Sequence, residues 1–380
     1  MAASTILTET QRSSFEEAIR CGTEQSCTKN PGHGLFINVS CLAMTDIPEQ
    51  IRNAKVLDFI KLVGKRTVHI ELFQHNNLGD HCGTGFVIKF WKQFYLCTNH
   101  HVINSSHKIK SCKIRFRYDR KDMEGILETK WTALVSEDTN QDISISTFEM
   151  TTEIEEFLSG LEICEVSDFI AKTELFYKDK TFNFDAFLIK ANDRYLFELF
   201  DYNGELGDID CLKAHCQVTF SQGEKKTFEA KLSQTNNKKY IKCPHYILIP
   251  SYIQSVFNRY EQLVAYDESR PIPCFVVSHP HGKEKRVSFG NFRPHSEVTL
   301  EGKPIICHTA PTCQGSSGAA VFPIGVRELQ FRCLIHSHPE PSLFHYPGAS
   351  TTNNFNIIQG GGYKQFIKIK QFIYDGHKGQ

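Results

Sequence analysis

Two adjacent serines, Ser316 and Ser317, lie between glycines in the segment CQGSSGAAVF, directly before a short apolar run. A serine hydroxyl becomes a nucleophile when a base takes its proton and a carboxylate holds that base in one tautomer. A Gly-Ser-Ser-Gly turn is also typical of an ordinary polar loop. The rest of the chain therefore decides whether this turn performs chemistry.

Candidates for the base and for the carboxylate are present earlier in the chain. The segment YLCTNHHVI ends a strand-like run with His100 and His101, and WTALVSEDTNQDISISTF places Asp142 at the end of a polar turn. An Asp that opens a buried strand can direct its carboxylate at a histidine across a cleft. The chain order His, Asp, Ser is that of chymotrypsin-type enzymes and differs from that of subtilisin and the α/β-hydrolases. The hydrolase elbow Gly-x-Ser-x-Gly is excluded because Ala319 occupies its last position.

Short strand-like segments surround these residues. TVHIELF, CGTGFVIKF and KIRFRYD are β-branched or aromatic, often alternate, and are bounded by Gly, Asn and Asp. A second group, which includes PCFVVSHP, KRVSFGNF and NFNIIQG, begins near residue 272. This pattern predicts an all-β fold with helical additions, built as antiparallel barrels or sandwiches.

The helical additions lie at the two ends of the chain. SSFEEAIR carries a helix-start signal, and IPEQIRNAKVLDFIKLVGK places apolar residues on roughly one helical face. YKQFIKIKQFIYDG predicts a short C-terminal helix that ends at Gly376. Within the middle segment, QVTFSQGEKKTFEAKLS predicts a hairpin with a glycine-containing turn, and SYIQSVFNRYEQLVAY has a helical apolar stripe.

Taken together, GTGFVI, TNHHV, DISIS, HPHG and GSSGAAVF resemble the trypsin-like serine peptidases, and are most similar to their intracellular HtrA-like branch. The resemblance implies two antiparallel six-stranded barrels. It covers roughly residues 65–150 and 270–375. In that pattern Thr98 stands three residues before the catalytic histidine, which selects His101 over His100. The nucleophile is the third residue of Gly-x-Ser-Gly, which selects Ser317 over Ser316.

The resemblance also implies the remaining site residues. The expected triad is His101, Asp142 and Ser317, and the backbone N–H groups of Gly315 and Ser317 would form the oxyanion hole. A residue without Cβ at position 315 leaves the turn free to aim its N–H at the tetrahedral oxyanion.

Further residues would line the substrate pocket. The pocket floor falls at Pro311 and one wall at Thr312, with His336 on the strand that follows the nucleophile. Pro311 offers no acid, which disfavours Lys or Arg as the residue on the acyl side of the cut bond. A Thr-His pair would favour Glu or Gln, whereas related intracellular enzymes with apolar specificity also carry a histidine on that strand.

We therefore expect four segments. Residues 1–64 form a helical N-terminal extension, residues 65–150 a first barrel, residues 151–268 an insertion, and residues 269–380 a second barrel with the C-terminal helix. The insertion stands where the fold usually needs only a short linker. The HtrA proteins carry a peptide-binding domain after the protease, which we do not expect in this sequence.

Composition limits the possible partners. Lys+Arg and Asp+Glu both number 43, so a net charge of zero argues against wholesale nucleic-acid binding. The N-terminus has no secretory signal pattern, and no stretch approaches 18 consecutive apolar residues, so no membrane association is expected. Val102 stands where secreted relatives have a cysteine, which leaves Cys82 without that partner. The 14 scattered cysteines therefore predict thiols in an intracellular compartment, cytoplasm or nucleus.

Three alternatives remain open for individual residues. Asp185, in NFDAFLIKA, competes with Asp142 as the orienting carboxylate. The alternating basic residues of HKIKSCKIRFRYDRK fit a barrel strand with one solvated face or an exosite for an acidic partner or nucleic acid. The insertion carries a spacing that could hold zinc, at Cys211, Cys216, Cys243 and His245.

The sequence thus predicts an intracellular serine endopeptidase that needs no cofactor and no metal, with protein or peptide substrates. The alternative function is a trypsin-like scaffold that binds proteins through its insertion without turnover. The presence of all three triad residue types together with Gly315 favours the enzyme.

Overall fold

A computed structural model describes residues 27, 30–73, 81–90, 93–104, 112–120, 124–138, 142–161, 170–177, 180–191, 194–200, 213–220, 223–235, 238–242, 250, 272–293, 299–300, 303–304, 306–324, 334–337, 344–345 and 356–360. The chain forms two compact units. The first comprises residues 1–88, 94–162 and 263–380, and the second comprises residues 89–93 and 163–262. Both predicted helices at the chain ends, in SSFEEAIR and YKQFIKIKQFIYDG, lie outside the described residues, as does SYIQSVFNRYEQLVAY.

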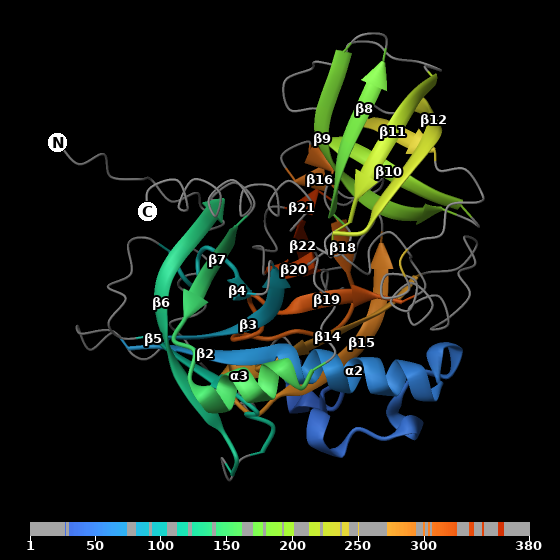
Figure 1. Cartoon of the computed structure of the whole chain (residues 1–380). Coiled ribbons are helices and arrows are strands. Elements are labelled where there is room, and N and C mark those ends of the chain that lie inside the picture. The colour runs from blue at the N-terminus through green and yellow to red at the C-terminus, as the bar shows by residue number, and fades with distance from the viewer. Residues whose placement is uncertain are drawn as a thin grey trace, which may run out of the picture. The chain divides into compact units, whose positions relative to one another are not determined.

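The first unit contains a closed antiparallel barrel of six strands, in the order β2-β3-β4-β7-β6-β5 (Figure 1). The strands are β2 (Thr67–Leu72), β3 (His81–Phe90), β4 (Gln93–Thr98), β5 (Cys112–Phe116), β6 (Leu127–Asp138) and β7 (Ile143–Phe148). In β5 buried Cys112, Ile114 and Phe116 alternate with half-exposed residues, as a strand with one solvated face requires.

The same unit contains a second barrel of six strands. It is closed because β15 pairs with both β14 and β18. Its members are β14 (Ile272–Ser278), β15 (Arg286–Arg293), β18 (Ile306–His308), β19 (Ala320–Pro323), β20 (Leu334–Ser337) and β22 (Asn356–Gly360), and β1 (Ile37–Asn38) adds to β15. The predicted fold class is confirmed: the first unit is all-β with helical additions, in two antiparallel six-stranded barrels of trypsin-like type. A separate three-stranded sheet consists of β16 (Thr299–Leu300), β17 (Lys303–Pro304) and β21 (Phe344–His345).

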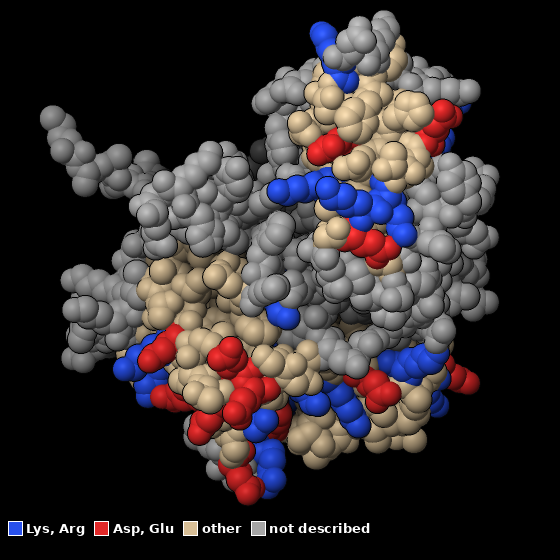
Figure 2. Space-filling model, viewed as in Figure 1, with Lys and Arg blue, Asp and Glu red and all other residues tan. Residues whose placement is uncertain are grey.

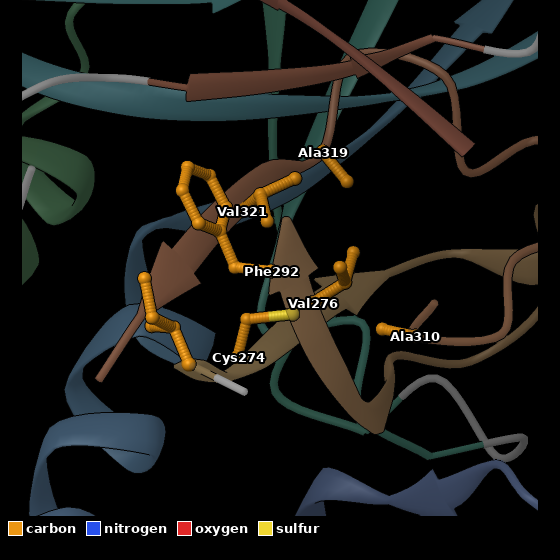
Figure 3. Packing of buried hydrophobic residues seen from close by; sticks show 7 residues of the cluster. Cys274, Val276, Phe292, Ala310, Ala319 and Val321 are labelled. Atoms are coloured by element: carbon orange, nitrogen blue, oxygen red, sulfur yellow. The ribbon is translucent and has the colours of Figure 1, made fainter. Parts of the chain in front are cut away.

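The core of the second barrel is small and apolar. Figure 3 shows Val276, Phe292 and Val321 directed toward one another from three strands. Gly290 lies against this core, and a Cβ there would come within 2.1 Å of the Ala310 nitrogen. The glycine therefore allows the segment that leads to the Ser317 turn to pack closely against β15.

Helix α2 (Ala54–Arg66) packs on this barrel through one apolar face. The Asn53 side chain accepts a hydrogen bond from the Val56 N–H and caps the helix, and Lys65 and Arg66 suit the negative end of its dipole. Phe59 meets the rings of Phe275 and Phe322 edge-on. Short 3₁₀ helices precede α2, at Pro31–His33, Val39–Cys41, Met44–Asp46 and Glu49–Ile51, and another forms at Pro280–Gly282.

Helix α3 (Thr152–Ser159) follows β7 and is capped by the Thr151 hydroxyl, which accepts from the Ile154 N–H. Within the described part of the chain, neither helix is long and apolar enough to cross a membrane.

The second unit, in the segment expected as an insertion, is itself a closed six-stranded barrel. Its order is β10-β13-β12-β11-β8-β9, with β8 (Ile170–Tyr177), β9 (Lys180–Ala191), β10 (Arg194–Phe200), β11 (Lys213–Thr219), β12 (Lys225–Thr235) and β13 (Lys238–Lys242). The predicted hairpin is confirmed as β11–β12, with Gly223 at φ +87° in its turn. The sequence did not predict the closure, because strand lengths alone do not reveal which edges meet.

Candidate active site

His101 and Asp142 form a buried pair at one end of the first barrel. The Nδ1 atom of His101 lies 2.7 Å from the Asp142 Oδ2 atom, and the His101 backbone N–H donates to Oδ1 at 2.9 Å. Asp142 is 5% exposed and His101 6%. A carboxylate bound in this way fixes both the orientation and the tautomer of the ring, so that Nδ1 carries the proton and Nε2 is left as the base.

The backbone around Asp142 explains how the carboxylate reaches the ring. Asp142 directly precedes β7 and has φ +48°, a left-handed conformation that Asp tolerates better than most residues. Its carbonyl accepts from the His100 N–H at 3.1 Å and from the Asn99 Nδ2 at 2.9 Å. The turn after β4 is thus tied to Asp142 through main chain and side chain together.

The two adjacent histidines have different partners. His100 Nδ1 lies 3.2 Å from the Glu137 Oε2, and that carboxylate is 30% exposed. His101 Nε2 is buried and has no hydrogen-bond partner among the described residues. His101 is therefore held by a buried carboxylate at Nδ1 while its Nε2 stays available for chemistry.

The two serines of the Gly-Ser-Ser-Gly turn also differ. Ser316 is fully buried, its hydroxyl lies 3.0 Å from the Ser278 hydroxyl, and it accepts from the Cys313 N–H at 3.3 Å. The Ser317 hydroxyl makes no hydrogen bond within the described part of the chain, and Ser317 is 8% exposed. Ser316 therefore holds the turn together, while the hydroxyl of Ser317 is uncommitted.

Thr84 links this turn to the histidine-bearing barrel, although the sequence analysis did not identify it. Its N–H donates to the Ser317 carbonyl at 2.9 Å, and its hydroxyl donates to the Gly315 carbonyl at 2.6 Å. The Thr84 carbonyl accepts from the Thr98 hydroxyl at 2.8 Å, three residues before His101. A threonine between two glycines in a strand, as in GTGFVI, was the signal that could have revealed it.

Two glycines are required by the shape of this turn. Gly315 has φ +83°, and a Cβ on it would lie 2.6 Å from the His279 carbonyl oxygen. Gly318 has φ +89°, and its Cβ would lie 2.1 Å from the Thr84 oxygen and 2.2 Å from the Thr98 hydroxyl. The N–H groups of Gly315 and Ser317 donate to no partner in the described residues, as an oxyanion hole requires.

The predicted pocket residues lie on two segments. Pro311 and Thr312 are buried in the stretch that leads to the turn. The Pro311 carbonyl accepts from the Ser288 hydroxyl at 2.6 Å, and the Thr312 carbonyl accepts from the Asn30 Nδ2 at 2.8 Å. His336 lies in β20 opposite Ile358, and its side chain is outside the described part of the structure.

A buried polar group supports the loop before β15. Lys285 is fully buried and its Nζ pairs with the Asp119 Oδ1 at 2.8 Å. Burial lowers the pKa of Lys285, and the nearby Asp119 carboxylate opposes that shift.

Burial, with a smaller effect of the Arg115 charge, lowers the pKa of His69 to about 3, so this ring is neutral at pH 7. It meets Tyr118 edge-on, with ring centroids 5.3 Å apart.

The interpretation of HKIKSCKIRFRYDRK as a barrel strand is confirmed, since its centre is β5. Arg115 binds both Glu71 and Glu128, and Lys113 also binds Glu128. Arg117 stacks over the Phe157 ring. Figure 2 shows basic and acidic side chains interspersed on the face in view. The charges of β5 are therefore paired within the strand's own neighbourhood.

Two other candidates lie in the second unit. Asp185 is in β9, opposite Lys172 and Phe200. Of the four residues with a zinc-like spacing, Cys216 is buried in β11, where burial raises its thiol pKa to about 12. The other three, Cys211, Cys243 and His245, lie outside the described residues.

Another group in the first unit could hold a metal. The ligand atoms of Cys27, His33, His281 and Cys313 all lie within 4.8 Å of one another. The sequence patterns did not connect these residues, although HPHG contains His281 and CQGSSGAAVF contains Cys313. The cysteines whose side chains are described, including Cys82, form no disulfide.

No protein-family profile and no curated protein matches the chain. Among solved structures it is similar to Rv3671c from M. tuberculosis H37Rv, crystallised as an inactive serine-to-alanine mutant. The two chains share 12% identity over 86% of this chain and 94% of the other, with a TM-score of 0.36. A likeness this distant carries no inference about the function of this chain.

Proposed function

We propose that the chain is a serine endopeptidase of trypsin-like fold, which hydrolyses peptide bonds through Ser317, His101 and Asp142. The observation that carries the proposal is the buried His101–Asp142 pair, which leaves Nε2 as a base without a described partner. The uncommitted hydroxyl of Ser317 supports it, because Ser316 is engaged by Ser278 and Cys313.

The reaction follows from these groups. His101 Nε2 takes the proton of the Ser317 hydroxyl as its oxygen attacks the substrate carbonyl, and Asp142 stabilises the imidazolium that forms. The N–H groups of Gly315 and Ser317 bind the oxyanion of the tetrahedral intermediate. The imidazolium then protonates the leaving amine, and an acyl-enzyme remains on Ser317. Water, activated by the same histidine, hydrolyses that ester.

Specificity is proposed from the pocket residues. Neither Pro311 nor Thr312 carries a negative charge that would bind Lys or Arg, so a basic residue on the acyl side is disfavoured. The choice between Glu or Gln and an apolar residue depends on His336. The described cysteines form no disulfide, which supports an intracellular site of action.

Hydrolysis of a peptide mixture by the wild-type chain, Ser317→Ala and Ser316→Ala tests the proposal. Ser317→Ala should remove all cleavage, a loss on the order of 10⁶-fold in kcat, because the triad acts as a unit. Ser316→Ala is the matched control and should keep most of the activity while losing about 1 kcal/mol of stability with its hydrogen bonds.

Two outcomes would contradict the proposal. If Ser316→Ala were the inactive variant, the nucleophile would be misassigned. If the folded wild-type chain cleaved nothing, the alternative would hold, namely a trypsin-like scaffold that binds proteins without turnover.

A further inference from the structure

Four side chains with metal-binding atoms meet beside the Ser317 turn, although they come from three distant parts of the chain. Cys27 and His33 belong to the N-terminal segment, His281 to the loop before β15, and Cys313 to the segment before Gly315. The Cys27 and Cys313 sulfurs are 3.4 Å apart, Cys313 Sγ lies 3.4 Å from the His33 Nε2, and the Nε2 atoms of His33 and His281 are 3.1 Å apart. None of the four residues has a role in the proposed reaction.

Three of the six ligand–ligand separations fit the edges of a tetrahedron around one metal ion, and the other three are at most 4.8 Å. With Zn–S near 2.3 Å and Zn–N near 2.05 Å, tetrahedral geometry gives about 3.8 Å between sulfurs, about 3.6 Å between sulfur and nitrogen, and about 3.4 Å between nitrogens. The three distances above are each within about 0.4 Å of those values. The two sulfurs are too far apart for a disulfide, whose S–S bond is about 2.05 Å.

Neighbouring donors suit thiolates at the two cysteines. The Asn30 backbone N–H donates to the Cys27 sulfur at 3.3 Å, and the Asn30 Nδ2 lies 3.2 Å from the Cys313 sulfur. A thiolate accepts hydrogen bonds far better than a thiol does, and metal-bound thiolates are commonly held by N–H groups of this kind. Asn30 is therefore placed to support both sulfur ligands at once.

The backbone at the two histidines is constrained in a matching way. His33 has φ +52° and His281 has φ +53°, a left-handed conformation that is uncommon for residues other than glycine. Such conformations persist where the surroundings over-determine them, often at ligand sites. Both rings are buried, at 4% and 7% exposure, and Cys313 is 1% exposed.

We propose that Cys27, His33, His281 and Cys313 bind one zinc ion, which ties the N-terminal segment to the turn that carries Ser317. Two thiolates and two imidazoles in a tetrahedral arrangement select zinc over the hard divalent cations, which prefer oxygen ligands. Because four protein ligands fill the coordination sphere, the ion is structural and does not hold a catalytic water.

The location gives the ion a role in shaping the oxyanion hole. Cys313 stands two residues before Gly315, and the His281 N–H donates to the Gln314 carbonyl. Gly315 in turn packs against the backbone of His279 and Gly282. A metal bound to His281 and Cys313 would hold both sides of this contact. Metal loss should therefore loosen the turn without removing any triad residue.

The test is the metal content of the chain, purified under reducing conditions without chelator and measured by plasma mass spectrometry. The wild-type chain should carry about one zinc per chain. The double variant Cys27→Ser/His33→Ala should carry none, and Cys41→Ser, which changes an exposed cysteine of the same segment, should keep the metal. Reconstitution with cobalt should give the intense visible bands of a tetrahedral thiolate site in the wild-type and control chains only.

Three results would overturn the proposal: no zinc and no cobalt spectrum in the folded wild-type chain, full zinc in the double variant, or a Cys27–Cys313 disulfide in the reduced preparation. Metal content is read without any assay of catalysis. A metal-loaded chain that cleaves no peptide would therefore leave this proposal standing while refuting the proposed function.

Discussion

Replacement of Gly318 by alanine should displace Ser317, the proposed nucleophile. The resulting loss of activity can be distinguished from the loss of folding stability by comparison with a control variant. Gly318 follows Ser317 directly and has φ +89°. An alanine Cβ there would lie 2.1 Å from the Thr84 carbonyl oxygen and 2.2 Å from the Thr98 hydroxyl. Both neighbours belong to the barrel that carries His101, so the added methyl group pushes the proposed nucleophile and the proposed base apart.

The magnitude follows from these distances. The 2.1 Å separation falls about 0.9 Å short of 3.0 Å, below which real Cβ contacts essentially never occur, so the turn or the strand must shift by that amount. A misplacement of about 1 Å can cost about 100-fold in rate. The left-handed conformation adds about 1–2 kcal/mol of destabilisation for any residue other than glycine.

Gly223 provides the matched control, because it has nearly the same backbone conformation in an open turn. Its φ is +87°, and no atom lies within 4 Å of a Cβ built on it. Gly223→Ala should lose only the conformational term, about 1–2 kcal/mol, and keep full activity. The assay is kcat/KM for peptide hydrolysis beside chemical denaturation of the wild-type chain and both variants. If Gly318→Ala cleaved as fast as Gly223→Ala, the contact between the turn and the histidine-bearing barrel would be refuted.

Four further outcomes are expected. Asp142→Asn should lower kcat by about 10⁴-fold, because the imidazole is then held in the wrong tautomer, whereas Glu137→Gln should have little effect; equal losses in peptide hydrolysis would contradict the pairing. Burial lowers the pKa of His69 to about 3 from 6.5, so between those values the unfolded chain binds a proton that the folded chain excludes. The free energy of unfolding should therefore fall as the pH is lowered through that window, by up to about 1.4 kcal/mol per pH unit. His69→Phe should reduce this slope in denaturation curves, and an unchanged slope would refute the assignment to His69. Reducing agent should leave peptide cleavage unaffected, and thiol titration after denaturation with chelator should approach all 14 cysteines, whereas a clear shortfall would count against an intracellular protein. A peptide library should show no preference for Arg or Lys on the acyl side, and such a preference would contradict the role given to Pro311.

The fold was largely predictable because its signals are local. Alternation in KIRFRYD and the apolar runs near residue 272 indicate strands wherever one side of a segment is buried, and the structure has β5 and β14 there. Helix α2 was predicted from the apolar stripe of Val56, Ile60 and Val63. The closed barrel of the second unit was not predicted, since closure depends on the pairing of β8 with both β9 and β11.

The candidate site was predictable only where residue types sit in a recognisable order. Resemblance selected His101 and Ser317, and their surroundings in the structure differ from those of His100 and Ser316 in a way that fits the choice. The role of Thr84 was not predicted, because hydrogen bonds between distant segments leave no periodic pattern in the sequence. The Cys27 and Cys313 pair was not predicted for the same reason, since 286 residues separate the two sulfurs along the chain.

The central claim is that Ser317 is a nucleophile activated by His101. Treatment of the folded chain with a fluorophosphonate probe, followed by peptide mapping with mass spectrometry, tests it directly. We expect one adduct per chain, on Ser317, formed as fast in Ser316→Ala as in the wild-type chain and lost in His101→Ala. An adduct on Ser316, or no adduct on a folded chain, would contradict the claim.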